Sequence, residues 1–305
     1  MSKKVVITIG DPAGCGPYIT LKAIENFRRK DIKFIIVGGK KIIEKIPSFS
    51  KVKKRIEIVD IDTSSRIKKG YISKKAGKAS LNYLKEALFL IKKENIKALV
   101  TAPVSKEAIK LIEPRFSGHT EFLADFFKVK NFAMMMVGEI KVVPFTRHIP
   151  LRDVSENISK KDLVRLINLV YESLKEKFGI KRPKIALASI NPHAGVNTFL
   201  DKEEKIMVSA IEECKNAEGP YPADSLFSLK NLKKFDCIIC GYHDQAMIPF
   251  KIFSFEKGVN LTLGLPIIRT SPAHGVAFEA IRREQPLFFT SMLEAIKLAV
   301  KLAFR

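Results

Sequence analysis

Short apolar segments alternate with longer amphipathic segments in the first third of the sequence, and this alternation constrains the fold most. Residues 5–9 (VVITI) predict a strand, and a glycine-rich turn separates them from a helix predicted at about 18–29. The pattern continues with a strand at 33–38, a long amphipathic helix at 76–93 and a strand at 98–101. Strands that alternate with helices predict a largely parallel sheet covered on both faces. The sequence therefore predicts an α/β fold.

The rest of the sequence extends this pattern without dividing it into serial parts. Residues 132–137 and 141–145 predict adjacent strands joined by a short turn. The later segments predict helices at 160–178, 202–214 and 291–304 and strands at 184–189 and 237–240. The length of 305 residues suits two domains or one large domain. Because neither an internal repeat nor an obvious linker separates them, two domains are expected to be intertwined.

The net charge of +22, from 54 basic and 32 acidic residues, raises the question of a nucleic-acid partner. The lysines are spread along the chain, often beside glutamate. The densest basic run, at 51–75, contains a single aromatic residue, Tyr71, although nucleic-acid binding favours interleaved aromatics. We therefore expect no nucleic-acid partner, but a positive field that favours anionic small substrates.

Cysteine usage and hydropathy exclude two further classes of protein. The four cysteines are too few for a disulfide scaffold. Cys237 and Cys240 have C-x-x-C spacing, but they flank two isoleucines in a strand-like run, which favours buried structural thiols over a redox pair or half a zinc site. No apolar run approaches the roughly 20 residues of a membrane span, and the N-terminus does not resemble a signal peptide. A cytoplasmic protein without membrane contact is expected.

Three of the five histidines lie within a few residues of the end of a predicted strand. These are His148, His193 and His243. Ligands gather at the carboxyl ends of strands in open α/β sheets, and three imidazoles there suit one divalent cation. Asp244, next to His243, would orient the ligands of such a site without itself binding the metal. The alternative is that each histidine only caps a loop.

Several donors indicate an anionic substrate. Arg269 suits bidentate capture of a carboxylate or a phosphate, and Lys251 supplies a point charge that can also exchange protons. Asn260 and the adjacent pair His119 and Thr120 add neutral donors. Solvated surface charge is the alternative reading, chiefly for Lys251.

Seven blocks along nearly the whole chain resemble, in the same order, those of the 4-hydroxythreonine-4-phosphate dehydrogenase family: ITIGDPAGCGP, TAPVSKEAI, GHTEFLA, NPHAG, GPYPADSLF, YHDQAMIPFK and VNLTLGLPIIRTSPAHG. The resemblance implies an isocitrate/isopropylmalate dehydrogenase-like fold, with two intertwined α/β domains and an active-site cleft between them. It implies an outer domain of approximately residues 1–120 plus 265–305. It also implies a central domain, 121–264, that carries the metal ligands and the dimer interface.

The resemblance also implies an activity. The family carries out the NAD-dependent oxidation of 4-phosphohydroxy-L-threonine to a β-keto acid. That acid decarboxylates to 3-amino-1-hydroxyacetone 1-phosphate in the biosynthesis of pyridoxal 5′-phosphate (vitamin B6). Members of the family are homodimers with shared active sites, and each site holds one divalent metal ion. Zinc is expected first, with magnesium, cobalt, manganese or nickel as alternatives.

The site residues implied by the resemblance follow from the matching motifs. His148 and His193 match metal ligands of one subunit, and His243 matches the ligand contributed by the other subunit. The family's substrate contacts correspond to His119, Thr120, Lys251, Asn260 and Arg269.

Two catalytic roles and a cofactor contact complete the expected site. Lys251 is the candidate for proton transfer, and Asp244 is expected to orient the metal cluster. His274 and Gly275 belong to a segment similar to the loop that holds the adenosine end of NAD in this fold, so they are the candidates for cofactor contact.

The sequence departs from the family pattern at Tyr18, at Val196-Asn197-Thr198 and at Ala273. These departures bear on the cofactor loop and on substrate specificity, so two alternative functions stay open. One is dehydrogenation of D-threonate or D-erythronate 4-phosphate by the same residues. The other is metal-dependent binding of a phosphorylated metabolite without catalysis.

Overall fold

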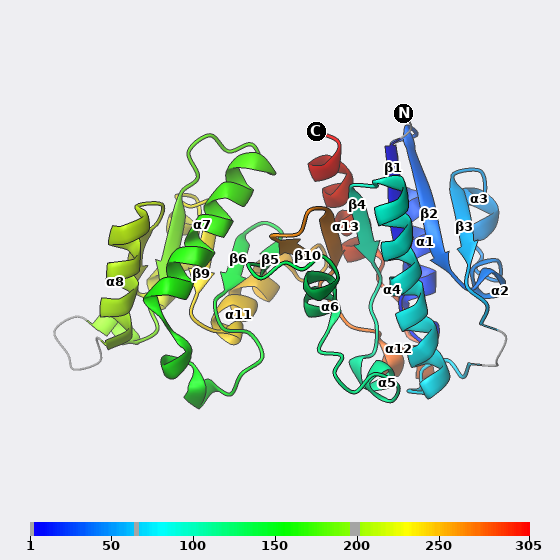
Figure 1. The fold of residues 1–305 in the computed structure, drawn as a ribbon, viewed down its shortest axis with the longest axis horizontal. Helices are drawn as coiled ribbons and strands as arrows, with labels where there is room; N and C mark the ends of the chain where they lie inside the picture. Colours follow the sequence, from blue (N-terminus) through cyan, green and yellow to red (C-terminus); the bar gives the residue numbers. More distant parts are fainter. Residues whose placement is uncertain (1–2, 64–66, 196–201) are drawn as a thin grey trace. The chain divides into compact units, whose positions relative to one another are not determined.

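The computed structural model of the protein describes residues 3–63, 67–195 and 202–305 (Figure 1). The chain forms two compact units. Unit 1 comprises Met1–Lys128 and Leu265–Arg305, and unit 2 comprises Val129–Gly264. The chain therefore leaves unit 1 once and later returns to it. The first division follows Lys128, a few residues beyond the approximate boundary expected near residue 120.

The sheet of unit 1 has the strand order β3-β2-β1-β4-β11, and its neighbouring strands pair in parallel. Its strands are β1 (Lys3–Thr8), β2 (Ile32–Gly38), β3 (Ile56–Asp60), β4 (Ala98–Thr101) and β11 (Ile268–Pro272). Its helices are α1 (Gly16–Asn26), α2 (Lys40–Ile43), α3 (Phe49–Val52), α4 (Lys74–Glu94), α5 (Lys106–Lys110), α6 (His119–Phe126), α12 (Phe278–Arg282) and α13 (Thr290–Ala303). Parallel strands need crossover connections, which these helices supply.

Buried β-branched residues and a close contact between helices hold unit 1 together. Val5, Val6 and Ile7 of β1 are fully buried. Helix α4 packs on β1 and β2, and α13 packs on β4, β11 and α1 (Figure 1). At Gly77 of α4, an added Cβ would lie 2.0 Å from the carbonyl oxygen of Ala108. Only glycine lets α4 and α5 approach this closely.

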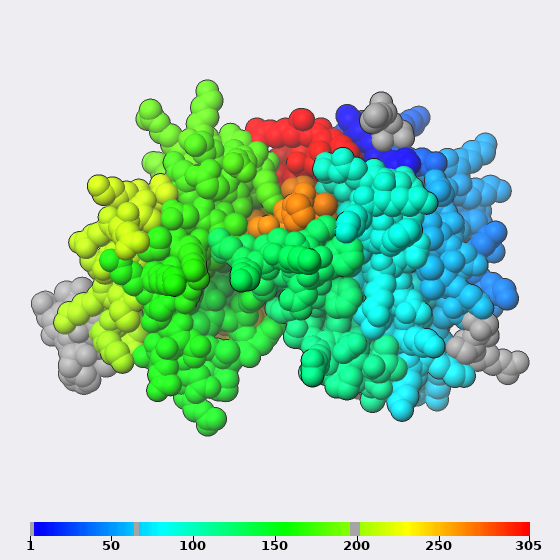
Figure 2. All heavy atoms as spheres, in the orientation of Figure 1, coloured from blue at the N-terminus to red at the C-terminus, as the bar shows by residue number. Residues whose placement is uncertain are grey.

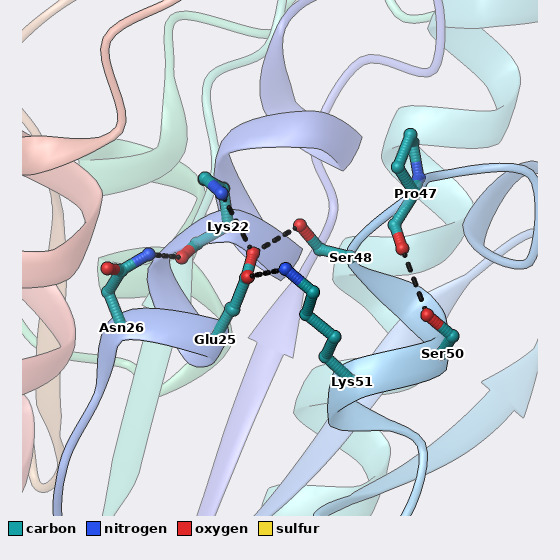
Figure 3. Close-up of polar contacts among 7 residues, drawn as sticks. All are labelled: Lys22, Glu25, Asn26, Pro47, Ser48, Ser50 and Lys51. Atoms are coloured by element: carbon teal, nitrogen blue, oxygen red, sulfur yellow. Dashed lines mark hydrogen bonds and ion pairs between the residues drawn. The ribbon is translucent and has the colours of Figure 1, made fainter.

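A carboxylate network joins α1 to the segment that contains α3 (Figure 3). Glu25 Oε1 accepts a hydrogen bond from Lys51 Nζ at 2.7 Å. Its Oε2 accepts from Ser48 Oγ at 2.7 Å and from Lys22 Nζ at 3.0 Å. These donors, Lys51 first, lower the pKa of Glu25 from its ordinary 4.5 to about 2. The network therefore stabilises the folded chain as long as this carboxylate is ionised.

The sheet of unit 2 has the strand order β10-β5-β6-β9-β7-β8. Its strands are β5 (Ala133–Val137), β6 (Lys141–Pro144), β7 (Ile185–Ala188), β8 (Glu218–Tyr221), β9 (Cys237–Cys240) and β10 (Val259–Leu263). Its α-helices are α7 (Lys160–Glu176), α8 (Lys202–Cys214), α9 (Ala223–Leu226), α10 (Leu229–Leu232) and α11 (His243–Ser254). Its 3-10 helices are η1 (Leu151–Asp153), η2 (Ser155–Asn157) and η3 (Pro192–Gly195). Strand β5 is antiparallel to β6 and β10, and the other pairs are parallel.

The sequence of α7 explains why this segment forms a helix. Ser159 Oγ accepts a hydrogen bond from Asp162 N at 3.2 Å and donates one to Asp162 Oδ2 at 2.6 Å, so the N-terminus is capped. Leu163, Ile167 and Val170 bury one side of the helix. Helix α8 packs against α7, and the yellow-green and green atoms of the two helices are adjacent in Figure 2.

Two exclusions made from the sequence concern cysteines and membrane spans. Cys237 and Cys240 lie at the two ends of β9, where both are buried and free. Burial raises the pKa of Cys237 to about 12, so this thiol stays protonated at neutral pH. The structure thus agrees with the prediction of structural thiols. Among the described residues, no helix is both long and apolar enough to cross a membrane.

Three segments differ from the sequence-based expectation. Residues 259–272, for which no strand was predicted, contain β10 and β11, and Gly264 between them interrupts the apolar pattern. His119, for which no helix was predicted, is the first residue of α6. His243, for which only the preceding strand was predicted, is the first residue of α11. Both histidines therefore lie at the start of a helix.

Candidate functional site

Three parallel strands of unit 2 carry the candidate metal ligands beyond their carboxyl ends. Strands β6 and β7 flank β9, and both pair with it in parallel. His148 lies beyond β6, His193 beyond β7 and His243 beyond β9. Because the carboxyl ends of parallel neighbours meet at one edge of a sheet, the fold brings the three segments to the same edge.

The backbone of Gly241 joins these strand ends. Its carbonyl oxygen accepts hydrogen bonds from Thr146 N at 3.1 Å and from Thr146 Oγ1 at 2.8 Å, two residues before His148. Its N–H donates to Gln245 Oε1 at 2.8 Å, and Gln245 Nε2 donates to Ser189 O at 2.7 Å. Gln245 therefore connects the end of β9 to the end of β7.

His148 and His243 form a pair of imidazoles at this edge. Their ring centroids lie 5.8 Å apart, and their planes are inclined at 41°. His243 Nδ1 lies 2.7 Å from Asp244 Oδ1, and this contact orients the ring. A proton on Nδ1 in this contact leaves the Nε2 lone pair available to a metal ion.

His193 lies in a strained turn. It has φ 55° and ψ 23°, and Ala194 follows with φ 56° and ψ 31°. The left-handed conformation costs about 1–2 kcal/mol for each residue with a side chain, so surrounding contacts must hold the turn. Among the described residues, no three His, Cys, Asp or Glu side chains gather closely enough to hold a metal ion. One chain thus pairs His148 with His243 and does not add His193 to that pair.

The chemistry of these donors fits a divalent metal ion. Two imidazoles that share Zn²⁺ have ring centroids roughly 5 Å apart, because each Zn–N bond is about 2.0–2.1 Å. His148 and His243 approach this separation. A carboxylate behind one imidazole, as Asp244 provides, is common in metal sites. Zinc takes at least three protein ligands, so the ion needs a further ligand beyond this pair.

Lys251 and Asn260 lie on the two elements that follow. Lys251 is on α11, eight residues after His243 and roughly 12 Å further along the helix axis. Burial lowers the pKa of Lys251, which suits proton transfer, and its Nζ lies 5.2 Å from the ring centroid of Phe255. Asn260 is on β10, and its Oδ1 is buried without a hydrogen-bond partner within the described parts of the chain.

Unit 1 has a polar cluster of its own around Arg269. This side chain projects from β11 and is 2% exposed, and its Nε and Nη2 donate to Thr101 Oγ1 on β4 at 3.1 and 2.6 Å. Burial lowers the pKa of Arg269 to about 10, and Glu121 partly opposes this shift. The guanidinium therefore stays charged at neutral pH, and a buried cation favours an anionic ligand.

His119 belongs to the same cluster. Its Nε2 is buried and has no hydrogen-bond partner within the described residues. Burial, followed by the charges of Arg269 and Lys106, lowers the pKa of His119 well below 6.5. The imidazole is therefore neutral at pH 7. Thr120, the next residue of α6, is also buried.

His274 and Gly275 lie between β11 and α12 in unit 1. His274 Nδ1 is 3.0 Å from Gly275 O, and an added Cβ at Gly275 would meet no atom within 4 Å. The next residue, Val276, accepts a hydrogen bond from Cys15 N at 2.9 Å, so this loop contacts the glycine-rich turn. A cavity of about 820 Å³ lies beside that turn, and Tyr18 is part of its wall.

The other two departures from the family pattern are placed as follows. Ala273 N donates to Ser291 Oγ at 3.0 Å, which ties the start of the loop to α13. Val196-Asn197-Thr198 lies outside the described residues.

Sequence reasoning missed the residues that hold the histidine segments in place. These are Thr146, Gly241 and Gln245. Most of them bond to residues that are distant along the chain, and local patterns carry no sign of such pairs. The one available signal was the position of Gln245, directly after the His-Asp pair.

The fold and the site define an α/β protein of two intertwined units, with histidines at the strand ends of one unit and a buried arginine in the other. The chain belongs to the family described as pyridoxal phosphate biosynthetic protein PdxA, whose sequence profile matches residues 8–299. This match confirms the family resemblance found in the sequence.

Individual relatives agree with the family match. The chain is 36% identical to a 4-hydroxythreonine-4-phosphate dehydrogenase of Sulfurihydrogenibium sp., over 98% of each chain. It is 37% identical to a protein of Oceanobacillus iheyensis that is provisionally named D-threonate 4-phosphate dehydrogenase, over 99% of each chain. The crystal structure of 4-hydroxythreonine-4-phosphate dehydrogenase from Klebsiella pneumoniae is 30% identical, with a TM-score of 0.86 over 100% of this chain and 99% of that chain. The two-unit α/β fold is thus the fold of the family.

Proposed function

We propose that the protein is an NAD- and divalent-metal-dependent oxidoreductase that acts on 4-phosphohydroxy-L-threonine in pyridoxal 5′-phosphate biosynthesis. The substrate is oxidised to a β-keto acid, which loses CO2 and yields 3-amino-1-hydroxyacetone 1-phosphate. One observation carries this proposal: the pair His148 and His243, oriented by Asp244, in a chain of this family. A cytoplasmic location belongs to the same proposal.

His148, His193 and His243 are proposed to hold the metal ion, zinc in first place, with magnesium, cobalt, manganese or nickel as alternatives. When bound, the ion supplies positive charge that favours loss of the hydroxyl proton and stabilises negative charge during decarboxylation. Asp244 keeps the His243 ring in position through the 2.7 Å contact at Nδ1.

The remaining site residues bind the substrate and move a proton. Arg269 is buried and charged, so it suits capture of the phosphate or the carboxylate. Neutral His119, Thr120 and Asn260 supply hydrogen bonds. Lys251 is proposed to exchange the hydroxyl proton, because burial lowers its pKa towards neutral pH.

NAD, when bound, accepts the hydride from the carbon that carries the hydroxyl group. His274 and Gly275 are proposed to contact it. Two observations support this placement. The open space at Gly275 leaves room for a ligand, and the nearby cavity of about 820 Å³ falls within the range of cofactor sites, roughly 300–1,000 Å³.

We also propose a homodimer with shared active sites. Helix α11, which begins at His243, exposes Ile248 and Ile252, and the residue that caps its C-terminus, Phe255, is exposed as well; the exposed fractions are 62, 74 and 72%. Their spacing of four and three residues places them on one face of the helix. An apolar stripe of this kind suits a second copy of the chain. The second copy would also supply one metal ligand: His148 and His193 are assigned to one subunit and His243 to the other, and the described residues of one chain bring no three ligands together.

The direct test is an assay of the purified protein with 4-phosphohydroxy-L-threonine and NAD. NADH should form, a chelator should stop its formation, and added Zn²⁺ or Mn²⁺ should restore it. His243→Ala should lower kcat/KM by more than about 100-fold, the upper end of the loss when a partner behind a ligand is removed. Unchanged NADH formation by this variant would end the assignment of His243.

A second candidate substrate is favoured by one relative. The Oceanobacillus iheyensis protein, 37% identical, is named for D-threonate 4-phosphate. Comparing kcat/KM for D-threonate 4-phosphate, D-erythronate 4-phosphate and 4-phosphohydroxy-L-threonine separates these activities. No turnover of any of the three, together with no NAD binding in calorimetry, would leave a metabolite-binding protein instead.

A further inference from the structure

A pair of buried glutamates from α8 holds the turn that carries His193. Glu203 and Glu204 lie in the first turn of α8 and are 9% and 4% exposed. Carboxylates are rarely buried unless hydrogen bonds satisfy their oxygens. The contacts of these oxygens therefore identify what the pair holds.

Glu204 holds the residues immediately before His193. Its Oε1 accepts hydrogen bonds from Ile190 N at 3.0 Å and from Asn191 N at 2.8 Å. Its Oε2 accepts one from Asn191 Nδ2 at 2.9 Å. These donors lie directly before the turn in which His193 and Ala194 adopt the left-handed conformation. Strained backbone persists only where surrounding contacts hold it, and Glu204 supplies such contacts.

Glu203 extends the contact to the segment beyond His148. Its Oε2 accepts a hydrogen bond from Asn191 Nδ2 at 3.0 Å, and its Oε1 accepts one from Ser155 Oγ. Ser155 belongs to η2, seven residues beyond His148. The side-chain amide of Asn191 thus bonds to both carboxylates, which matches its two N–H groups. Through this amide, the pair joins the His193 segment to the His148 segment.

We propose that Glu203 and Glu204 are positioning residues of the metal site, which fix the place of His193 relative to His148. The inference rests on the metal binding proposed above. The two carboxylates act on the histidines through Asn191, Ser155 and the backbone. Their removal should weaken metal binding by about 10–100-fold, as the loss of partners behind metal ligands does.

The test uses the full-length protein and Co²⁺, whose visible absorption reports the geometry of its ligands. The double variant Glu203→Gln/Glu204→Gln keeps the side-chain volumes but sets amide N–H groups against Asn191 Nδ2. We expect its Kd for Co²⁺ to rise by about 10–100-fold and its absorption spectrum to change. Glu212→Gln, an exposed residue of the same helix, is the matched control and should keep both properties at wild-type values.

A third substitution provides a rescue. Adding Asn191→Asp to the double variant turns the shared donor into an acceptor for both new amides. Each hydrogen bond can then form with its polarity reversed. We expect affinity and spectrum to return to within several-fold of wild type. If the two glutamates only anchored α8, the double variant would have a changed Tm. Its folded form would then keep the Co²⁺ absorption spectrum of the wild type.

Two results with the variants would overturn the inference. One is a double variant that is folded by circular dichroism and binds Co²⁺ with the affinity and spectrum of wild type. If the double variant does not fold, Ser155→Ala decides, because it removes only the link to the His148 segment. Wild-type binding by Ser155→Ala is then the second overturning outcome, and several-fold weaker binding is the expected one. A wild-type protein that binds no Co²⁺ would instead overturn the proposed metal site, and this inference with it.

Discussion

His119 and Glu25 bind protons differently in the folded and the unfolded chain. Burial lowers the pKa of His119 well below 6.5, and Lys51, Ser48 and Lys22 lower the pKa of Glu25 to about 2. In both cases the unfolded chain takes up the proton more readily, so stability falls as the pH falls. The two pH windows differ. The loss of stability due to His119 begins below about pH 6.5. The loss due to Glu25 extends from about pH 4.5 to about pH 2.

The first prediction concerns His119. As the pH falls from 6.5 to 5.5, this residue should lower the free energy of unfolding by up to about 1.4 kcal/mol per pH unit. His119→Gln removes the titrating group, so its free energy of unfolding should depend less on pH in this window. Urea unfolding of both proteins at pH 7.5, 6.5 and 5.5, and at pH 4.5 and 3.5 for the control window, measures the difference.

The window below pH 4.5 serves as an internal control, because Glu25 is intact in both proteins and should give both the same further loss. Equal slopes for wild type and His119→Gln between pH 6.5 and 5.5 would mean that the buried ring takes up a proton in the folded state. The assigned burial of Nε2 would then be wrong.

At the scale of elements, strongly periodic segments were predictable from the sequence. The ranges 98–101, 202–214 and 237–240 agree with β4, α8 and β9. Helix α11 was missed because Pro249 lies inside it, and proline lacks the N–H that a helix interior uses. The helix forms nonetheless, since Ala246 and Phe250 bury one of its sides.

The candidate site was predictable in part, for a similar reason. Each of the three candidate metal ligands follows a predicted strand, and the sequence shows this directly. The bonds that join the strand ends connect Thr146 to Gly241 and Gln245 to Ser189, which lie 95 and 56 positions apart. These pairs depend on the strand order β6-β9-β7, and no local pattern of residues specifies that order.

Helix α7 supports the second prediction. Ser159 caps it through Asp162 N, so Ser159→Ala leaves this N–H without its partner. The free energy of unfolding should fall by about 1 kcal/mol. Ser50→Ala is the control, because Ser50 is exposed and donates only a 3.3 Å bond to Pro47 O, so its effect should stay within about 0.5 kcal/mol. Equal losses in the two variants, measured by urea unfolding, would contradict the capping role.

At the scale of the whole molecule, intertwined domains followed from the absence of a linker in the sequence. The exact residue at which the chain passes from one unit to the other did not follow from the sequence. The approximate boundary expected near residue 120 falls in α6, which belongs to unit 1 with the rest of Met1–Lys128.

The proposed dimer gives the third prediction at this scale. Ile252→Asp places a carboxylate in the exposed stripe of α11 and should raise the dimer dissociation constant by more than about 10-fold. Sedimentation velocity at several concentrations measures this shift. Leu229→Asp changes an equally apolar residue of α10, 68% exposed, and should leave the dimer intact. A wild-type protein that stays monomeric at every concentration would remove the shared active site.

The return of the chain to unit 1 determines when a newly made molecule can finish folding. A ribosome releases the N-terminal residues first, so all of Val129–Gly264 emerges before β11 and α13. Until then β4 lacks its neighbour β11, and one side of that strand stays open to mispairing. The portion begun first is therefore completed only after Val129–Gly264 has emerged, and the open edge of β4 is exposed to mispairing until β11 arrives.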